Sequence, residues 1–252
     1  MLKLIQQKGA GAVAYFLKIK SSKLQWHIRS KPVCGSTEIE LSKWLNQKPL
    51  NKNYPRAFLA ERQSYGRGQY GRTWNSLKGG VWVSVAIPLR ENPQSTELFG
   101  LAISVALAKK LHQNCVPAKI KWPNDLLVQN RKLAGFLPRL IIRGSNLKFV
   151  RIGIGLNVLN QVPKSGISLR QILGRKNLSK ELWTAEVLIV LEEVLSLLKD
   201  QEKLCKQASE LLWSNQYKEK STGCIWKIEG FNENGSLRLR RGSQSKSLSR
   251  WE

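Results

Sequence analysis

The chain has 252 residues, of which 42% are hydrophobic, so it can bury a sizeable core in one large domain or in one domain with a small module. It has no run of 18 apolar residues, which argues against a transmembrane helix, and its four cysteines and two histidines lack metal-ligand spacing. The formal net charge of +25 favours an anionic partner, although the basic residues are spread along the whole chain.

The first 30 or so residues are basic and weakly patterned, and they are too few for a winged helix-turn-helix module with a linker. Their short apolar patch has charges on both sides, which does not fit a signal peptide, so we expect reduced thiols and a cytoplasmic location. Residues 36–47 predict a helix, with Ser36 or Thr37 as its N-cap and acidic residues in its first turn. Residues 56–64 predict a short strand that runs into a glycine-rich loop.

The middle of the chain alternates between strand and helix patterns. Residues 79–89 form a continuous apolar run that predicts a buried strand, and residues 96–113 have the 3.6-residue period of a helix packed on a core. Two apolar runs in residues 118–142, separated by residues 129–131, suggest a hairpin. Residues 149–158 predict another strand.

The C-terminal part changes character. Residues 183–214 are strongly helical in pattern, whereas residues 223–241 alternate and contain the hairpin turn Asn234-Gly235. We therefore expect one large domain over residues 1–215 and a small all-β module over residues 216–252.

The loop "SYGRGQYGRTWNS" (64–76) is rich in glycine and arginine. Glycines let backbone N–H groups face an anion, and arginines bind phosphate or carboxylate with two hydrogen bonds. A disordered nucleic-acid-binding tail has a similar composition, but such tails do not lie between predicted strands. The sequence therefore favours a loop that closes over an anionic ligand, in which we single out Gly66, Arg67, Gly68, Gly71, Arg72 and Trp74.

Three shorter motifs follow this loop. "KWPND" (121–125) places an amide and a carboxylate at the mouth of the hairpin, although Pro-Asn-Asp is also common in ordinary turns. Lys132 would return an ammonium group to the same end, although most single lysines are solvated charges. Gly153 and Gly155 share one face of a strand, which implies either a close approach to the backbone or a bulge.

In this order and spacing the motifs resemble the biotin–protein ligases. The matching stretches are "GST" (35–37), "ERQSYGRGQYGRTW" (61–74), "KWPNDLLVQNRKLAG" (121–135) and "IGIGLN" (152–157). The resemblance covers residues 36–157, extends more loosely to the C-terminal module, and fits the form of the family without an N-terminal DNA-binding domain.

The resemblance implies an α+β fold: a mixed β-sheet catalytic domain with helices, followed by an SH3-like β-barrel module. It implies that biotin reacts with ATP and Mg²⁺ to give biotinyl-5′-AMP, and that the biotinyl group then moves to a lysine of a biotin carboxyl carrier protein, usually in acetyl-CoA carboxylase. We expect no specific DNA binding and no membrane association, and a homodimer is left open.

The resemblance also implies three sets of site residues. Those expected at biotin are Ser36, Thr37, Gln63, Arg67, Gly135, Gly153 and Gly155. Those expected at the nucleotide are Arg67, Gly68, Gly71, Arg72, Trp74, Lys132 and Asn157. Those expected to take part in catalysis are Arg67, Asn124, Asp125 and Lys132, and the metal ligands are not identified.

The chemistry agrees with this assignment. A carboxylate and a triphosphate must come into contact, and the cations Arg67 and Lys132 would cancel their repulsion and stabilise the charge that builds on phosphorus. Asp125 would receive the proton of the attacking lysine.

Two positions depart from the family pattern. Gln69 replaces the middle arginine of the usual GRGRxGR loop, which would weaken retention of the adenylate. Arg139 stands where the strand often carries an acidic residue, and nothing in the sequence explains that change.

Three other functions remain open at this point. A lipoate–protein ligase shares the fold and the two-step reaction. A basic nucleic-acid-binding protein would explain the charge and would show salt-sensitive binding without ATP chemistry. A non-catalytic, biotin-responsive regulator is disfavoured because the N-terminal DNA-binding module is not seen.

Overall fold

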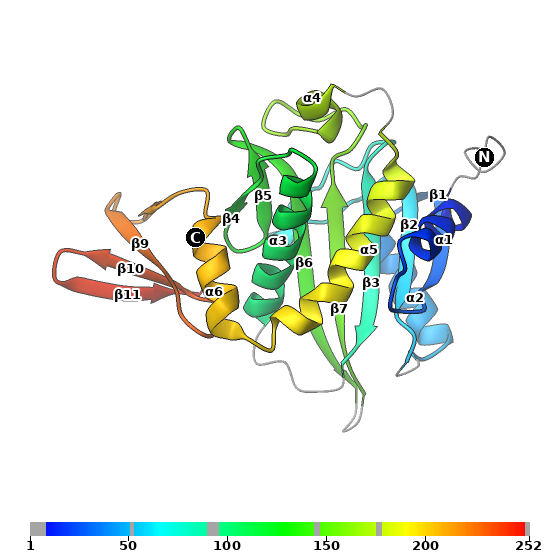
Figure 1. Cartoon of the computed structure of the whole chain (residues 1–252), viewed down its shortest axis with the longest axis horizontal. Coiled ribbons are helices and arrows are strands. Elements are labelled where there is room, and N and C mark those ends of the chain that lie inside the picture. The colour runs from blue at the N-terminus through cyan, green and yellow to red at the C-terminus, as the bar shows by residue number, and fades with distance from the viewer. Residues whose placement is uncertain (1–8, 51–52, 90–95, 144–146, 175–177, 250–252) are drawn as a thin grey trace.

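A seven-stranded mixed sheet runs through the middle of the molecule (Figure 1). The computed structural model describes residues 9–50, 53–89, 96–143, 147–174 and 178–249. β1 and β2 are parallel, and every other neighbouring pair in the sheet is antiparallel. In spatial order the strands are β1 (His27–Cys34), β2 (Arg56–Gln63), β3 (Val81–Pro88), β7 (Leu147–Leu156), β6 (Arg131–Arg143), β5 (Asp125–Val128) and β4 (Lys119–Lys121).

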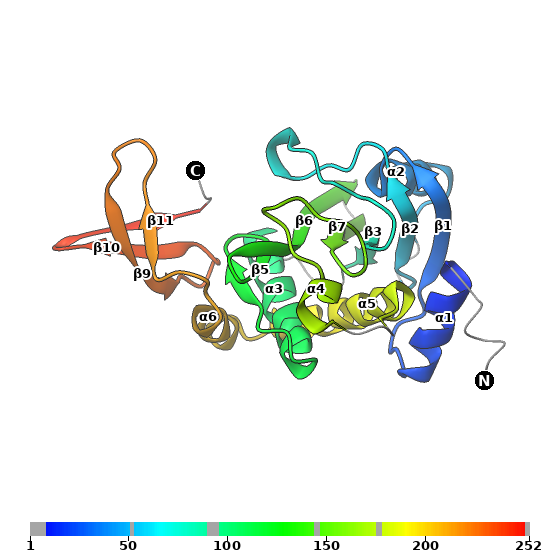
Figure 2. The same cartoon turned by 90° about the horizontal axis from the view of Figure 1, so that it is seen from above.

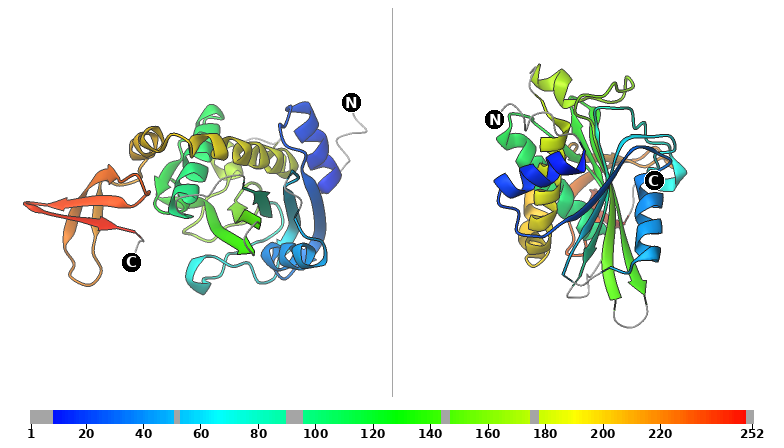
Figure 3. Two further views of the ribbon diagram at one scale, coloured as in Figure 1. Left: turned by 90° about the horizontal axis from the view of Figure 1, so that it is seen from below. Right: turned by 90° about the vertical axis from the view of Figure 1, so that its right-hand side faces the viewer.

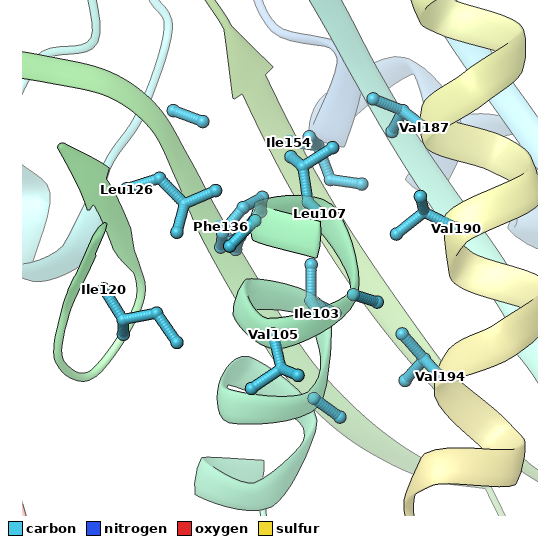
Figure 4. Packing of buried hydrophobic residues seen from close by; sticks show 14 of the residues in the cluster. Ile103, Val105, Leu107, Ile120, Leu126, Phe136, Ile154, Val187, Val190 and Val194 are labelled. Carbon is cyan, nitrogen blue, oxygen red and sulfur yellow. The ribbon is translucent and has the colours of Figure 1, made fainter. Parts of the chain in front are cut away.

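Three helices cover one face of this sheet: α1 (Ala10–Ile19), α3 (Thr96–Gln113) and α5 (Lys180–Leu197) (Figure 3). The alternate residues of β3 that point to this face are apolar and buried, as are most residues of α3. Figure 4 shows α3 and α5 bringing their aliphatic side chains together with those of the strands. Along the described chain, no helix is both long and apolar enough to span a membrane.

The opposite face carries α2 (Thr37–Gln47), and we call it the α2 face. Leu41, Trp44 and Leu45 of this helix pack on Phe58 and Phe149 in a second, smaller core. As predicted, α2 has a serine N-cap: the hydroxyl of Ser36 accepts a hydrogen bond from the backbone N–H of Glu38. α2 packs mainly on β2 and β3, so the neighbouring part of β7, β6 and β5 is left for the candidate site.

The C-terminal residues form a separate four-stranded antiparallel sheet in the order β11-β10-β9-β8, which extends away beyond α6 (Gln201–Glu210) (Figure 1). Tyr217, Trp226 and Leu237 of this sheet belong to the same buried cluster as α3. The small β module is therefore present, while a domain boundary at residue 215 stays a prediction. The strands of this C-terminal sheet are β8 (Gln216–Lys218), β9 (Ile225–Phe231), β10 (Leu237–Arg241) and β11 (Gln244–Leu248).

Two parts of the chain differ from the expectation. Residues 183–214 form two helices, α5 and α6, because the side chain of Asp200 accepts from the backbone N–H of Lys203 and starts a new helix. The weakly patterned first residues contain α1 and the edge strand β1. Since β1 is largely exposed, its sequence lacks the apolar alternation on which strand prediction depends. A short helix, α4 (Leu169–Leu173), and the 3₁₀ turn η2 (Gln69–Gly71) complete the fold.

Glu186 of α5 is a buried carboxylate that joins three helices. Its oxygens lie 2.6 Å from Nζ of Lys20, directly after α1, and 2.9 Å from Nζ of Lys110 in α3. Burial disfavours the charged carboxylate, but the two ammonium groups outweigh this and hold the pKa of Glu186 below its ordinary value of 4.5. The ion pairs therefore stabilise the fold fully above about pH 4.5, and this contribution is lost as the pH falls further.

We expect Glu186→Gln to lower the free energy of unfolding by about 1.5–3 kcal/mol near neutral pH, because it leaves two ammonium groups without their carboxylate. The difference from the wild type should shrink in acid, where Glu186 is protonated in both states. Urea denaturation at several pH values measures this. Glu193→Gln, on the exposed side of the same helix, is the control, and equal losses in the two variants at neutral pH would contradict the assignment.

Candidate active site

A cleft of about 340 Å³ opens on the α2 face of the sheet. Its floor consists of two rows of residues that are paired across the strands. Ser84, Gly153 and Leu137 form one row, and Gly155, Gly135 and Asp125 form the next. The loop of residues 64–76, which follows β2 and is coloured cyan, lies over this face (Figure 2).

Most of the predicted site residues line this cleft. They are Ser36, Thr37, Gln63, Arg67, Gly68, Arg72, Trp74, Asn124, Asp125, Lys132, Gly135, Gly153 and Gly155.

Asn157 and Gly71 lie outside the lining of the cleft. The amide of Asn157 donates to the backbone carbonyl of Lys132 at 3.2 Å and accepts from Asn160 at 3.0 Å. In this structure Asn157 thus fixes the backbone of Lys132. Gly71 has a φ of 73°, which lets the loop turn back over the sheet.

At one end of the cleft, four polar residues are hydrogen-bonded to one another. The backbone N–H and the hydroxyl of Thr37 both donate to Oε1 of Gln63, at 2.8 and 3.0 Å. Gln63 Nε2 donates to the hydroxyl of Ser76 at 2.7 Å, and the hydroxyl of Ser84 lies 2.8 Å from that of Thr37. Gln63 therefore ties the start of α2 to the far end of the loop. The two serines were not predicted, because lone serines carry no pattern.

The loop itself is folded as a small hairpin. Gly68 donates to the carbonyl of Arg72 at 2.7 Å, and Trp74 donates to the carbonyl of Gly66 at 2.8 Å. Backbone pairing of this kind favours the ligand-loop reading over a disordered tail.

Trp74 lies flat on two glycines of the sheet. A Cβ atom on Gly155 would lie 2.5 Å from Cε2 of Trp74, and one on Gly135 would lie 2.9 Å from Cζ3. The edge of the ring also meets Trp82, with 6.3 Å between the ring centroids. At Gly155 the close approach is therefore the one of the two readings that is observed, and the approaching group is the indole ring, whereas a Cβ atom on Gly153 would meet no atom nearer than 3.5 Å.

We expect Gly155→Ala to release the loop from the sheet, because its Cβ would overlap the indole ring of Trp74. Trypsin should then cut after Arg67 and Arg72 severalfold faster than in the wild type, which a time course with mass spectrometry measures. Gly153→Ala is a matched control, since the nearest atom to its Cβ would be Oε1 of Glu38 at 3.5 Å. Equal cleavage rates in all three proteins would contradict this role of Gly155.

Lys132 and Asp125 form the charged centre of the site. Nζ of Lys132 lies 2.8 Å from Oδ1 of Asp125 and 4.8 Å from the centroid of the Trp74 ring. Asn124 donates to the carbonyl of Phe136 at 2.5 Å and so holds the turn that precedes Asp125.

A β-bulge puts Lys132 on the cleft face. Across β5 and β6, Leu126 pairs with Ala134 but the next residue, Leu127, pairs with Lys132. Without this shift, Lys132 would point to the opposite face from Asp125, because successive residues of a strand alternate. The backbone of Lys132 is also held from outside the sheet, by Ser165 at 2.8 Å and Ile167 at 3.0 Å.

Sequence reasoning missed Glu38, whose only noted role was as an acidic residue in the first turn of a helix. Glu38 lines the cleft, and its Oε2 accepts from Nη2 of Arg151 at 2.9 Å. Arg151 is the cross-strand neighbour of Arg139. Arg139 itself is exposed, and nothing in the structure explains why it replaces an acidic residue.

The cleft is strongly cationic. Both of its carboxylates, on Glu38 and Asp125, are already paired with a cation. Among the described residues, no group of three or more His, Cys, Asp and Glu could hold a metal ion. Such a cleft is suited to an anionic ligand with several charges. Its cations are Arg67, Arg72, Lys121, Lys132 and Lys220, of which Lys121 and Lys220 were not predicted.

Comparison with known proteins shows which family the chain is similar to. Residues 33–157 match the model of the biotin/lipoate A/B protein ligase family. The bifunctional ligase/repressor BirA of Bacillus subtilis is 36% identical over 141 residues, which is 50% of this chain and 42% of that protein. The chain is similar to this family over these residues.

Two further members of this family are also similar to the chain. The biotin–[acetyl-CoA-carboxylase] ligase of Mycobacterium tuberculosis is 34% identical over 113 residues, 42% of this chain and 40% of that protein. The chain thus spans less than half the length of these two curated relatives. The biotin protein ligase of Aquifex aeolicus, solved with biotin and ATP, superposes with a TM-score of 0.71 over 90% of this chain and 97% of its own, at 22% identity. These family members confirm the resemblance and the α+β fold.

Proposed function

We propose that this protein is a biotin–protein ligase, which activates biotin with ATP and transfers it to a lysine of a biotin carboxyl carrier protein. One observation carries the proposal: Lys132 and Asp125 meet at 2.8 Å on the floor of a cationic cleft, between a polar end and an arginine-bearing loop. The names of the relatives support both substrates, because those relatives are biotin ligases and the Aquifex aeolicus protein was solved with biotin and ATP.

In the first step, a carboxylate oxygen of biotin attacks the α-phosphorus of ATP, and the bond from that phosphorus to the departing pyrophosphate breaks. Biotin, held by Ser36, Thr37 and Gln63, would lie along the floor at Gly153. Lys132 and Arg67 would then stand between its carboxylate and the α-phosphate and offset their repulsion. The products are biotinyl-5′-AMP and pyrophosphate.

In the second step, the amine of the carrier lysine attacks the biotinyl carbonyl, AMP leaves, and the amine gives up its proton. Asp125 is the carboxylate closest to Lys132, and we assign it the attraction of the incoming ammonium group and the uptake of its proton. The loop that carries Trp74 would exclude water, which would otherwise hydrolyse the mixed anhydride.

The Mg²⁺ ion would enter with ATP. Nucleotide-bound Mg²⁺ is held by phosphate oxygens, water and at most one or two carboxylates. Since Asp125 and Glu38 are each paired with a cation, the cleft offers no free carboxylate among the described residues, and the ion would be carried by the phosphates. A cytoplasmic location and the absence of specific DNA binding stay predictions, and a homodimer is left open.

The deciding experiment is biotin-dependent exchange of labelled pyrophosphate into ATP, followed by transfer of labelled biotin to a biotin carboxyl carrier domain. Lipoate and a lipoyl domain serve as the competing substrate pair. Exchange that depends on lipoate instead of biotin would assign the chain to the lipoate ligases. Salt-sensitive binding of nucleic acid without any exchange would support the binding-protein alternative.

A further inference from the structure

Lys220 reaches the cleft from the C-terminal sheet. It lies in the turn between β8 and β9, whereas all other residues that line the cleft fall between Ser36 and Gly155.

The C-terminal sheet, which carries Lys220, is joined to the central sheet by hydrogen bonds. In β4, the backbone of Ile120 donates to Leu211 at 2.7 Å and accepts from Trp213 at 2.8 Å, just before β8 begins. The indole N–H of Trp122 donates to the carbonyl of Gly235 at 3.1 Å, from the β4–β5 turn to the β9–β10 loop. Lys220 therefore lines the cleft from a sheet that is hydrogen-bonded to β4 and to the turn after it.

Glu219, which precedes Lys220 in the chain, is paired with a different lysine. Glu219 forms an ion pair with Lys246 of β11 and accepts from the hydroxyl of Thr222 at 2.5 Å. Lys246, the main partner, lowers the pKa of Glu219 below its ordinary value, so the carboxylate stays ionised in this pair. Lys220 is exposed, and among the described residues it has no acidic partner.

The cleft thus has more cations than the reaction at the α-phosphate requires. Arg67 and Lys132 are assigned to that phosphate and to the biotin carboxylate. Lys121, at the end of β4, lies 5.8 Å from the ring of Trp213, at the junction between the two sheets. Lys121 and Lys220 therefore line the junction side of the same cleft with positive charge.

We propose that Lys220 binds the β- and γ-phosphates of ATP, so that the C-terminal sheet completes the nucleotide site. The inference rests on the proposed function. As the bond between the α-phosphorus and the bridging oxygen breaks, the negative charge moves onto the departing pyrophosphate, and an ammonium group there stabilises it. The ligand class is a polyphosphate, which AMP and biotin lack.

The test compares Lys220→Glu with Lys218→Glu, a charge reversal at an exposed lysine of β8 that does not line the cleft. In pyrophosphate exchange, Lys220→Glu should raise the KM for ATP at least about tenfold relative to the control, as expected for one charge-assisted contact. The KM for biotin and the inhibition constant of AMP should not change. Lys220→Arg should keep most of the ATP affinity, which separates a charge effect from a folding defect.

A second assay supplies biotinyl-AMP directly and measures transfer to the carrier domain. Lys220→Glu should transfer at the control rate, because this step uses no polyphosphate. An equal KM for ATP in the two variants would overturn the inference alone. So would a normal KM for ATP with slow transfer, which would assign Lys220 to carrier docking. A wild-type chain without biotin-dependent exchange would overturn the proposed function itself, and the inference with it.

Discussion

Lys132→Ala is expected to slow the formation of biotinyl-AMP by about 10²–10³-fold, comparable to the loss of one oxyanion donor. Two anions must meet in the first step, and the ammonium group of Lys132 faces the floor of the cleft where they would do so. Its removal also leaves Asp125 without its partner at 2.8 Å, which adds a negative charge next to the reacting phosphate. Single-turnover formation of the adenylate, measured by rapid quench, reports this step.

Arg131→Ala is the matched control, because Arg131 precedes Lys132 in the same strand but does not line the cleft. The double variant Lys132→Ala/Asp125→Asn should recover part of the lost rate by removing the unpaired carboxylate. A near-normal rate in Lys132→Ala would refute its role at the phosphate.

Asp125→Asn should still form the adenylate at a substantial rate but transfer it to the carrier at least about tenfold more slowly. The acceptor is a lysine amine with an ordinary pKa of about 10.4, so only about one in 2,500 is neutral at pH 7. A carboxylate at this point would attract the ammonium group and take its proton, and asparagine keeps the size but loses the charge. The defect should shrink as the pH rises toward the lysine pKa.

Because Asp125 forms an ion pair with Lys132, its role in proton uptake must be separated from a role in orienting Lys132. If the main task of Asp125 were to orient Lys132, both steps would slow together in Asp125→Asn. Transfer measured with supplied biotinyl-AMP removes the first step from the assay. A normal rate there would show that the proton acceptor is another group or water.

Local chemistry was enough to predict much of the fold. The serine cap and acidic first turn of α2, the apolar run of β3 and the helical period of α3 each depend on residues close together in the sequence. The motifs, read with the family resemblance, also identified most of the residues that line the cleft.

Contacts between distant segments could not be predicted in this way. The position of Lys220 depends on how the C-terminal sheet docks on β4, and the pair of Glu38 with Arg151 joins residues 113 positions apart. β1 is an exposed edge strand, and its pairing with β2 is a property of the sheet and not of its own sequence.

The bulge in β6 also favours one pairing register of this strand over the alternatives. Lys132 and Gly135 are three residues apart, an odd spacing that a regular strand cannot keep on one face. If β6 straightened, the ammonium group would turn into the aliphatic layer beneath α3, and the buried side chain of Leu133 would turn out toward the cleft. Both changes are costly, since a charge would lose water and an apolar side chain would gain it. The ammonium group of Lys132, which the proposed reaction needs, therefore also disfavours the register in which β6 has no bulge.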